Sequence, residues 1–196
     1  MDGIAVVTGA SAGIGEAIAK RLIDEGRTVV ALQRRAPRFA HPRLSHRKVD
    51  LTDVNAASAI AREIAAQYPV HHLVNNAGAN RPGLLEDATI EDLDYAYALN
   101  VRAAIILIQA FVPCMREARF GRIVSMSSRA IMGKTQRTAY SAAKAAIVGT
   151  TRTRSSSHRT ASRSMPWRRG RWRRSFSITD TRRAVKSGSG CWTALP

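Results

Sequence analysis

A glycine-rich turn directly after the first apolar run constrains the fold of this chain more than any other feature. The segment TGASAGIG spans residues 8–15 and follows the apolar run IAVV at residues 4–7. Its glycines allow a tight turn, close approach of the backbone to a pyrophosphate and close packing of a helix on a sheet. The pattern therefore predicts a strand, a turn and a helix that bind a dinucleotide. For this motif alone, a plain glycine-rich turn of an α/β protein is the simpler alternative.

Short apolar runs alternate with longer segments of helical periodicity over the first three quarters of the chain. We predict strands at residues 4–8, 28–33, 46–49, 71–75 and 122–127. We predict helices at residues 13–25, 54–68, 90–115 and 138–150. Asp53 and Thr89 can cap the second and third helices, and Gly26 suits the end of the first. The alternation indicates an α/β fold, a Rossmann-like doubly wound parallel sheet with helices on both faces.

The distribution of charge divides the chain near Thr151. Residues 1–151 hold 19 Lys and Arg against 13 Asp and Glu, whereas residues 152–196 hold 12 against 1. The second segment has too few branched aliphatic residues to offset an ordering cost of about 1 to 2 kcal/mol per residue. We therefore predict one domain over residues 1–151 and a basic, Arg/Ser-rich tail over residues 152–196 that is not a domain.

The composition argues against several other classes of protein. Cys114 and Cys191 have no metal-ligand spacing, so we expect neither a disulfide framework nor a metal site. No apolar run approaches the roughly 20 residues that cross a bilayer, and the first residues lack the basic flank of a secretory signal. We therefore expect a cytoplasmic protein with no membrane segment.

Two further motifs follow the fourth and fifth predicted strands. The first, NNAG at residues 75–78, has small residues that leave room for an adenosine ribose. The second, GRIVSMSS with TAYSAAK, sets Tyr140 and Lys144 four residues apart, so they share one face of a helix. A phenol ordinarily titrates near 10, and a neighbouring cation favours its anion. Lys144 should therefore make Tyr140 a usable acid and base.

These ordered motifs resemble the short-chain dehydrogenase/reductase family, in its classical branch. The resemblance covers residues 4–151 and also includes VDL at residues 49–51 and LNV around Asn100. It implies hydride transfer between NAD(P)(H) and a small carbonyl or alcohol substrate, by an enzyme similar to 3-oxoacyl-carrier-protein reductases or to sugar and polyol dehydrogenases. It implies a catalytic tetrad of Asn100, Ser128, Tyr140 and Lys144.

The resemblance also implies which residues hold the cofactor. They are Gly9, Ser11, Gly13, Ile14, Gly15, Arg34, Arg35, Asp50, Leu51, Asn76, Ala77, Gly78, Tyr140 and Lys144. Asp50 would accept a hydrogen bond from the adenine amino group, and Asn100 would hold a water that links Lys144 to solvent. Intact members of the family would assemble as homodimers or homotetramers.

The choice of catalytic serine depends on how the strand ends. Alignment on GRIVSMSS selects Ser128, twelve residues before Tyr140, whereas the family more often shows a spacing of thirteen, which would select Ser127. Alternation along a strand puts neighbouring side chains on opposite faces, and a loop loses a residue more easily than a strand shifts its register. We therefore predict that Ser128 acts on the substrate and that Ser127 is structural.

The end of the second predicted strand bears on the choice of coenzyme. An acid there would bond the ribose 2′-hydroxyl of NAD, whereas cations favour the 2′-phosphate of NADP. Gln33 occupies the expected acid position, and Arg34 and Arg35 follow it. We predict NADP, with NAD possible. The alternative is that both arginines are solvated surface residues, and Ala12 is not the basic residue that many NADP-preferring members carry.

The tail departs from the family pattern. One choice of codons for residues 157–172, read from the last base of the first codon, encodes APHGITVNAVAPGPV, which resembles the expected sixth-strand region. We hypothesise that residues 152–196 are a frameshifted translation of a family gene. The alternative function class is an inactive pseudoenzyme or a basic nucleic-acid-binding protein, in which tail arginines contact phosphates and Trp167, Trp172 and Trp192 stack on bases. The substrate remains open.

Overall fold

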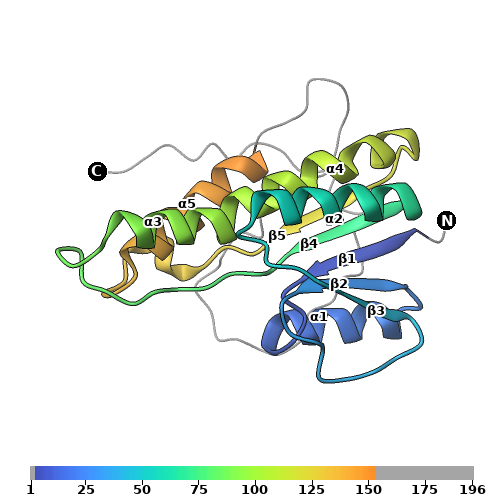
Figure 1. Cartoon of the computed structure of the whole chain (residues 1–196), viewed down its shortest axis with the longest axis horizontal. Helices are drawn as coiled ribbons and strands as arrows, with labels where there is room; N and C mark the ends of the chain where they lie inside the picture. The colour runs from blue at the N-terminus through green and yellow to red at the C-terminus, as the bar shows by residue number, and fades with distance from the viewer. Residues whose placement is uncertain (1–2, 153–196) are drawn as a thin grey trace, which may run out of the picture. The chain divides into compact units, whose positions relative to one another are not determined.

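Five parallel strands form one sheet in the order β3-β2-β1-β4-β5 (Figure 1). They are β1 (Ile4–Thr8), β2 (Val29–Gln33), β3 (Leu44–Lys48), β4 (Val70–Asn75) and β5 (Arg122–Ser125). The computed structural model describes residues 3–152, so most of the predicted tail and the frameshift hypothesis lie outside the described residues. The strand order changes direction between β1 and β4, the switch point at which such sheets bind ligands. The predicted Rossmann-like fold is confirmed.

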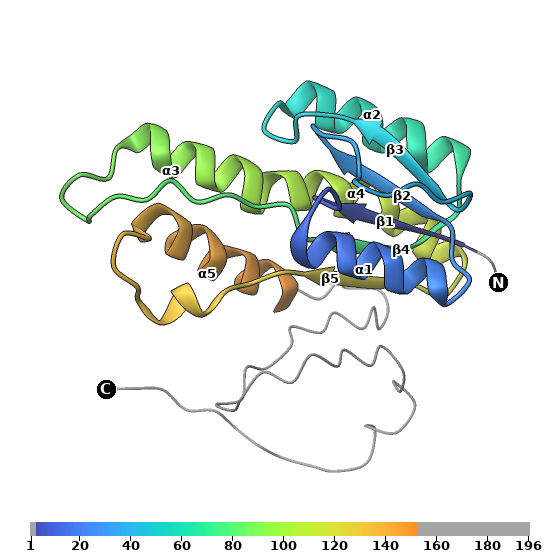
Figure 2. The same ribbon diagram turned by 90° about the horizontal axis from the view of Figure 1, so that it is seen from below.

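Helices cover both faces of the sheet. They are α1 (Gly13–Asp24), α2 (Val54–Gln67), α3 (Ile90–Tyr97), α4 (Ala103–Glu117) and α5 (Thr138–Arg152), with a π-helical turn η1 (Ala98–Arg102) and a 3-10 turn η2 (Arg129–Met132). α1 lies on one face, and α2 and α4 lie on the other (Figure 1). α3 and α5 pack side by side beyond the carboxyl ends of the strands (Figure 2).

The central strands are apolar on both faces because each face is covered. Ile4 and Val6 of β1 belong to a core with α2 and α4, whereas Ala5 and Val7 belong to a second core with α1. All five residues of β1 are buried. Full burial of a valine or isoleucine side chain contributes about 1.5 to 3 kcal/mol, so this strand holds the two layers together.

The predicted helix caps are confirmed. The Asp53 carboxylate accepts hydrogen bonds from the backbone N–H groups of Asn55 and Ala56, at 2.8 and 3.0 Å. The Thr89 hydroxyl accepts from the N–H of Asp92 at 3.2 Å. Gly26, at φ 84°, ends α1 in the left-handed conformation that glycine adopts without strain.

Several predicted boundaries are wrong. The helix predicted over residues 90–115 is divided by η1, and the strand predicted over residues 46–49 lies at Leu44–Lys48. β3 is an edge strand of mostly polar, half-buried residues, so hydrophobic periodicity could not fix its start. The last strand ends at Ser125 and not at residue 127. Beyond it Ser128 caps η2, a turn that the sequence did not predict.

One described helical stretch is apolar and long enough to cross a membrane on length and composition alone. It is Ile90–Glu117, a stretch of 28 residues whose most apolar 18-residue window has a mean hydropathy of 1.7, a signal that our count of continuous apolar runs missed. Part of it is a core helix, because Leu107 and Phe111 of α4 are fully buried against the sheet and α2. A buried core helix reaches the same hydropathy without a membrane.

Candidate active site

The glycine loop joins β1 to α1 in a conformation that its glycines require. Gly9 and Gly13 have φ values of 70° and 60°, in the region that residues with a side chain rarely adopt. Gly15 meets a different constraint, because a Cβ there would lie 2.2 Å from the carbonyl oxygen of Gly9. The first turn of α1 therefore packs directly on the loop. Its free N–H groups and positive dipole end face the space beyond β1.

Thr8 and Asn76 fasten the glycine loop to the segment after β4. The Thr8 hydroxyl accepts hydrogen bonds from the backbone N–H groups of Asn76 and Ala77, both at 2.9 Å. The Asn76 amide donates to the carbonyl oxygens of Thr8 and Gly9, at 3.0 and 3.1 Å. The Asn76 side chain thus ties the ends of β1 and β4 together. These bonds hold both loops at a fixed separation across the switch point.

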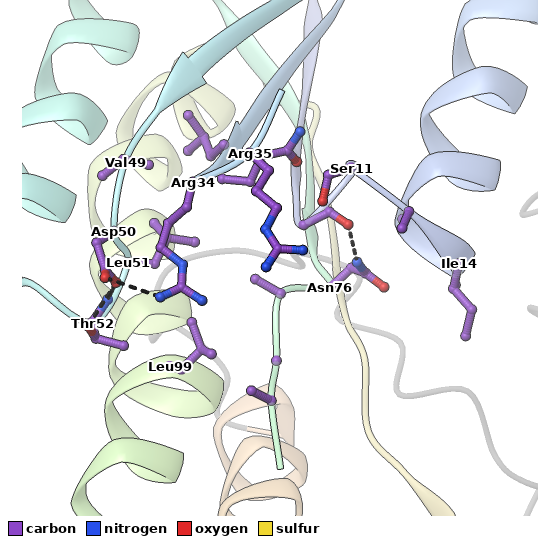
Figure 3. A pocket seen from close by; sticks show the side chains of 18 of the residues that line it. Ser11, Ile14, Arg34, Arg35, Val49, Asp50, Leu51, Thr52, Asn76 and Leu99 are labelled. Atoms are coloured by element: carbon purple, nitrogen blue, oxygen red, sulfur yellow. Dashed lines mark hydrogen bonds and ion pairs between the residues drawn. The ribbon is translucent and has the colours of Figure 1, made fainter. Parts of the chain in front are cut away.

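A pocket of about 490 Å³ opens beyond the strand ends. Eleven of the predicted cofactor residues line it: Gly9, Ser11, Ile14, Gly15, Arg34, Arg35, Asp50, Leu51, Asn76, Ala77 and Gly78. Figure 3 shows Arg34 and Arg35 extending into this pocket from the end of β2. Gly13, Tyr140 and Lys144 do not line it. The structure therefore brings together residues from four separate segments that the sequence selected.

Asp50 lies at one wall of the pocket as a carboxylate. Its Oδ1 accepts hydrogen bonds from the N–H and the hydroxyl of Thr52, at 2.9 and 2.8 Å, which lower the pKa of Asp50. The Arg34 guanidinium adds to this shift from 3.7 Å (Figure 3). Oδ1 thus already accepts two hydrogen bonds, and Oδ2 faces the Arg34 cation. A bound adenine group would share Oδ2 with that cation.

Gln33 is buried and engaged by the glycine loop. Its amide oxygen accepts a hydrogen bond from the backbone N–H of Ala10, and its amide nitrogen has no partner among the described residues. The side chain is 6% exposed. Gln33 therefore supports the glycine loop and also lines the pocket described above.

Asn100 lies in the π-helical turn between α3 and α4. Its amide nitrogen donates to the carbonyl oxygens of Ala96 and Ala79, at 2.8 and 3.3 Å, while its amide oxygen is buried without a described partner. A π-helical turn widens the helix, and such turns occur often at functional sites. The turn aims the unpaired Asn100 oxygen at the segment after β4.

The side chains of Asn100 and Lys144 both approach the space that a Cβ at Gly78 would fill. A Cβ at position 78 would stand 2.5 Å from the Asn100 amide oxygen and 3.2 Å from the Lys144 ammonium nitrogen. Both polar atoms thus converge on one point next to the pocket that Gly78 lines. A buried acceptor without a partner and a nearby donor are the arrangement that holds a bridging water.

Tyr140 and Lys144 lie on one face of α5, as predicted. The Lys144 nitrogen is 5.6 Å from the centroid of the Tyr140 ring and donates a hydrogen bond to the carbonyl oxygen of Met126 at 2.8 Å. Lys144 is 3% exposed, and burial lowers its pKa to about 8. The side chain is therefore a cation at neutral pH that can lose its proton at mildly alkaline pH.

The two serines after β5 differ in their hydrogen bonds. The Ser127 hydroxyl donates to the carbonyl oxygen of Lys144 at 3.1 Å. The Ser128 hydroxyl accepts from the N–H of Ala130 at 3.2 Å, which leaves its own proton available. The strand alternation we used to separate them is wrong, because β5 ends at Ser125. Their hydrogen bonds now distinguish the two residues.

Sequence reasoning missed Thr8, the Met126 carbonyl and Arg137. Thr8 carries a signal, since a hydroxyl at a strand end before a glycine turn often bonds neighbouring backbone. The Met126 carbonyl could not be found from side-chain identity. The guanidinium carbon of Arg137 lies 5.9 Å from the centroid of the Tyr140 ring. Among residues 3–152 no cluster of potential metal ligands occurs.

The sheet order, the glycine loop and the pocket define a Rossmann-like α/β protein. Residues 3–162 match the short chain dehydrogenase family, and the chain belongs to that family. D-threitol dehydrogenase of Mycolicibacterium smegmatis is 34% identical over 161 residues, which cover 76% of this chain and 62% of that protein. The predicted family is confirmed.

Solved structures give the same result. A short-chain dehydrogenase from Streptomyces avermitilis superposes with a TM-score of 0.72 at 33% identity, covering 77% of this chain and 59% of that chain. A 3-oxoacyl-(acyl-carrier-protein) reductase from Agrobacterium tumefaciens with NADP bound has a TM-score of 0.67 at 29% identity, covering 76% and 61%. The chain spans between 50% and 64% of the length of the first curated relatives it matches.

Proposed function

We propose that this protein is an oxidoreductase that transfers a hydride between NADP(H) and a small carbonyl or alcohol compound. The observation that supports the proposal most is the convergence at Gly78. Gly78 lines the pocket, and a Cβ at this position would stand 2.5 Å from the Asn100 oxygen and 3.2 Å from the Lys144 nitrogen. Family membership and the NADP bound to the Agrobacterium reductase agree with it.

The pocket fits an adenine dinucleotide phosphate by its shape and its charges. The space without side chains at Gly9 and Gly15 allows a pyrophosphate to approach the N-terminus of α1. Arg34 and Arg35 supply cations for a 2′-phosphate, and Asp50 supplies an acceptor for the adenine amino group. When bound, the nicotinamide supplies or accepts the hydride.

The remaining steps of the proposed mechanism belong to side chains of this protein. The Tyr140 hydroxyl donates a proton to the carbonyl oxygen during reduction and removes it from the alcohol during oxidation. The Lys144 cation, 5.6 Å from the ring centroid, stabilises the phenolate. The free Ser128 proton stabilises the developing oxyanion. Asn100 and Lys144 hold a water at Gly78 that returns the proton to solvent.

The experiment for this proposal is a panel of carbonyl and alcohol compounds with both coenzymes. It uses the chain with its reading frame restored in codons 150–158, since we expect little turnover from the 196-residue chain. We expect NADPH oxidation with at least one carbonyl class, among them 3-oxoacyl thioesters and sugar or polyol compounds. Absence of turnover with every class, together with absence of NADPH binding, would reject the proposal. Sedimentation of the same protein tests the expected homodimer or homotetramer.

A further inference from the structure

Two cations, one directly before α5 and one on it, lie near the Tyr140 ring. Arg137 stands directly before α5 and precedes the tyrosine by three residues, whereas Lys144 lies on α5 and follows the tyrosine by four. The guanidinium carbon of Arg137 is 5.9 Å from the ring centroid, and the Lys144 nitrogen is 5.6 Å from it. The Arg137 carbonyl accepts from the N–H of Ser141, which fixes its backbone at the start of the helix.

The two cations differ in what they can reach. Lys144 is buried and donates a hydrogen bond to the Met126 carbonyl, so breaking that bond in order to bind a substrate would cost free energy. Arg137 is half-buried, and no acid in residues 3–152 forms an ion pair with it. A cation beside the predicted acid and base, without a described counter-charge, can bind an anionic ligand.

A second arginine at this end of the fold is already engaged. Arg81, in the loop after β4, pairs with Asp92 at 3.2 Å, and its guanidinium lies 4.0 Å from the centroid of the Tyr95 ring. Its charge is thus balanced within the protein. Arg81 therefore does not compete with Arg137 for an anion.

The segment that leads into α5 is basic and partly apolar. Residues 126–137 contain three cations, Arg129, Lys134 and Arg137, and no acid. Ile131 and Met132 in the same segment are 41% and 79% exposed. A ligand that contacts this segment beside Tyr140 meets positive charge and apolar surface together.

We infer that Arg137 binds a carboxylate of the substrate next to the reacting carbonyl group. The inference rests on the proposed function and narrows its substrate to oxo acids or hydroxy acids. A guanidinium holds a carboxylate through two parallel hydrogen bonds, whereas it offers a neutral carbonyl compound no such pairing. The Arg137 guanidinium lies beside the Tyr140 ring, so the bound carboxylate would orient the neighbouring carbonyl toward the phenol.

The test compares two probes that differ only in charge next to the same carbonyl. The 196-residue chain is saturated with NADPH, and the fluorescence of the bound coenzyme is followed during titration with 3-oxobutanoate or with its methyl ester. We expect the acid to bind about tenfold more tightly than the ester, because hydrogen bonds to charged groups are the strong ones. This preference should decrease as salt is added.

Variants separate recognition of the anion from a structural effect. Arg137→Gln should weaken binding of the acid about tenfold and leave the ester unchanged. Arg137→Lys should restore part of the loss, because lysine keeps the charge and loses the planar fork. Arg129→Gln, at an exposed position of the same segment, is the matched control and should keep the preference for the acid.

Three outcomes would overturn the inference. They are equal binding of acid and ester, binding of neither to the NADPH complex, and an unchanged preference in Arg137→Gln. Failure to bind NADPH at all, in this chain and in the frame-restored chain, would instead reject the proposed function, so the two failures are distinguishable. A thermal melt of each variant confirms that a change in binding does not come from unfolding.

Discussion

The Lys144 ammonium nitrogen lies 5.6 Å from the centroid of the Tyr140 ring, inside a side-chain environment that leaves the lysine 3% exposed. Burial of a cation opposes its charged form, and the pKa of Lys144 falls to about 8. The protein thus accepts a cost in stability to keep a cation beside a phenol. Such a cost is common at functional sites.

The free-energy cost of burying the Lys144 cation predicts how the stability of the protein depends on pH. Below pH 8 the lysine is charged in both states, and folding carries the full burial penalty. Between pH 8 and 10.5 the unfolded chain holds a proton that the folded chain has lost, so the penalty declines as pH rises. Lys144→Met should therefore raise the free energy of unfolding by about 1 to 3 kcal/mol at pH 7, with a smaller gain at pH 9.5.

Urea unfolding at the two pH values measures this difference. Lys48→Met, at an exposed position of β3, is the matched control and should change stability little at either pH. A gain from Lys144→Met that is the same at pH 7 and 9.5 would contradict the burial argument.

His72 predicts a loss of stability in acid. Burial is the largest cause that lowers the pKa of His72, and together with the nearby Arg27, His71 and Arg122 it brings this pKa to about 4. As the pH falls from 6.5 to 4, the unfolded chain takes up a proton that the folded chain does not. The free energy of unfolding should therefore decline over this range. In His72→Asn the decline measured by urea unfolding should be shallower, whereas His41→Asn, at an exposed position, should keep the original slope.

Gly15 predicts a steric loss at the glycine loop. In Gly15→Ala the new Cβ would stand 2.2 Å from the Gly9 carbonyl oxygen and 2.4 Å from the Asn76 amide nitrogen, so the loop must move. We expect a loss of about 1 to 3 kcal/mol in stability and a marked loss of NADPH binding. Gly149→Ala, in α5 with no atom within 4 Å of the added Cβ, should instead stabilise by about 0.5 to 1 kcal/mol. Normal NADPH affinity in Gly15→Ala would reject the predicted role of the loop.

Arg34 and Arg35 predict the coenzyme preference. Replacing both with glutamine should lower the affinity for NADPH about tenfold while changing the affinity for NADH little, because only the 2′-phosphate needs the cations. Arg38→Gln, an exposed arginine outside the pocket, is the matched control. Direct binding of both coenzymes measures the ratio. An unchanged ratio in the double variant would mean that the two arginines are solvated surface residues.

The frameshift hypothesis predicts a DNA sequence. Resequencing across codons 150–158 should reveal a single-base error or a true lesion, and restoring the base should encode APHGITVNAVAPGPV after that point. An intact frame that encodes the basic tail, with no compensating insertion or deletion in close relatives, would contradict it. Salt-sensitive nucleic-acid binding that is lost on removing residues 152–196 would favour the alternative function.

Much of the fold could be predicted because buried strands leave a direct signal. β1 is apolar throughout since both of its faces are covered, and the predicted bounds agree with the structure. β3 lies at the sheet edge with polar residues, so its start was misplaced. The π-helical turn at Asn100 could not be predicted, since helical periodicity continues through an inserted residue.

For the site, too, local sequence motifs could be predicted and long-range contacts could not. Residues whose chemistry lies in a local motif, such as Gly15 and Asn76, were selected from the sequence and line the pocket. The burial of Gln33 depends on a hydrogen bond with Ala10, far away in sequence, which no local pattern reveals. Nor does a local pattern reveal that the Asn100 amide oxygen is buried beside Gly78 without a described hydrogen-bond partner.

The most direct test of the proposed function is the Tyr140→Phe variant of the frame-restored chain. Hydride transfer from NADPH to an accepted carbonyl compound is followed alongside NADPH binding. We predict a loss of turnover of at least a hundredfold with NADPH affinity within twofold of the parent, because the variant removes only the proton-donating hydroxyl. Full turnover with phenylalanine at position 140 would contradict the account.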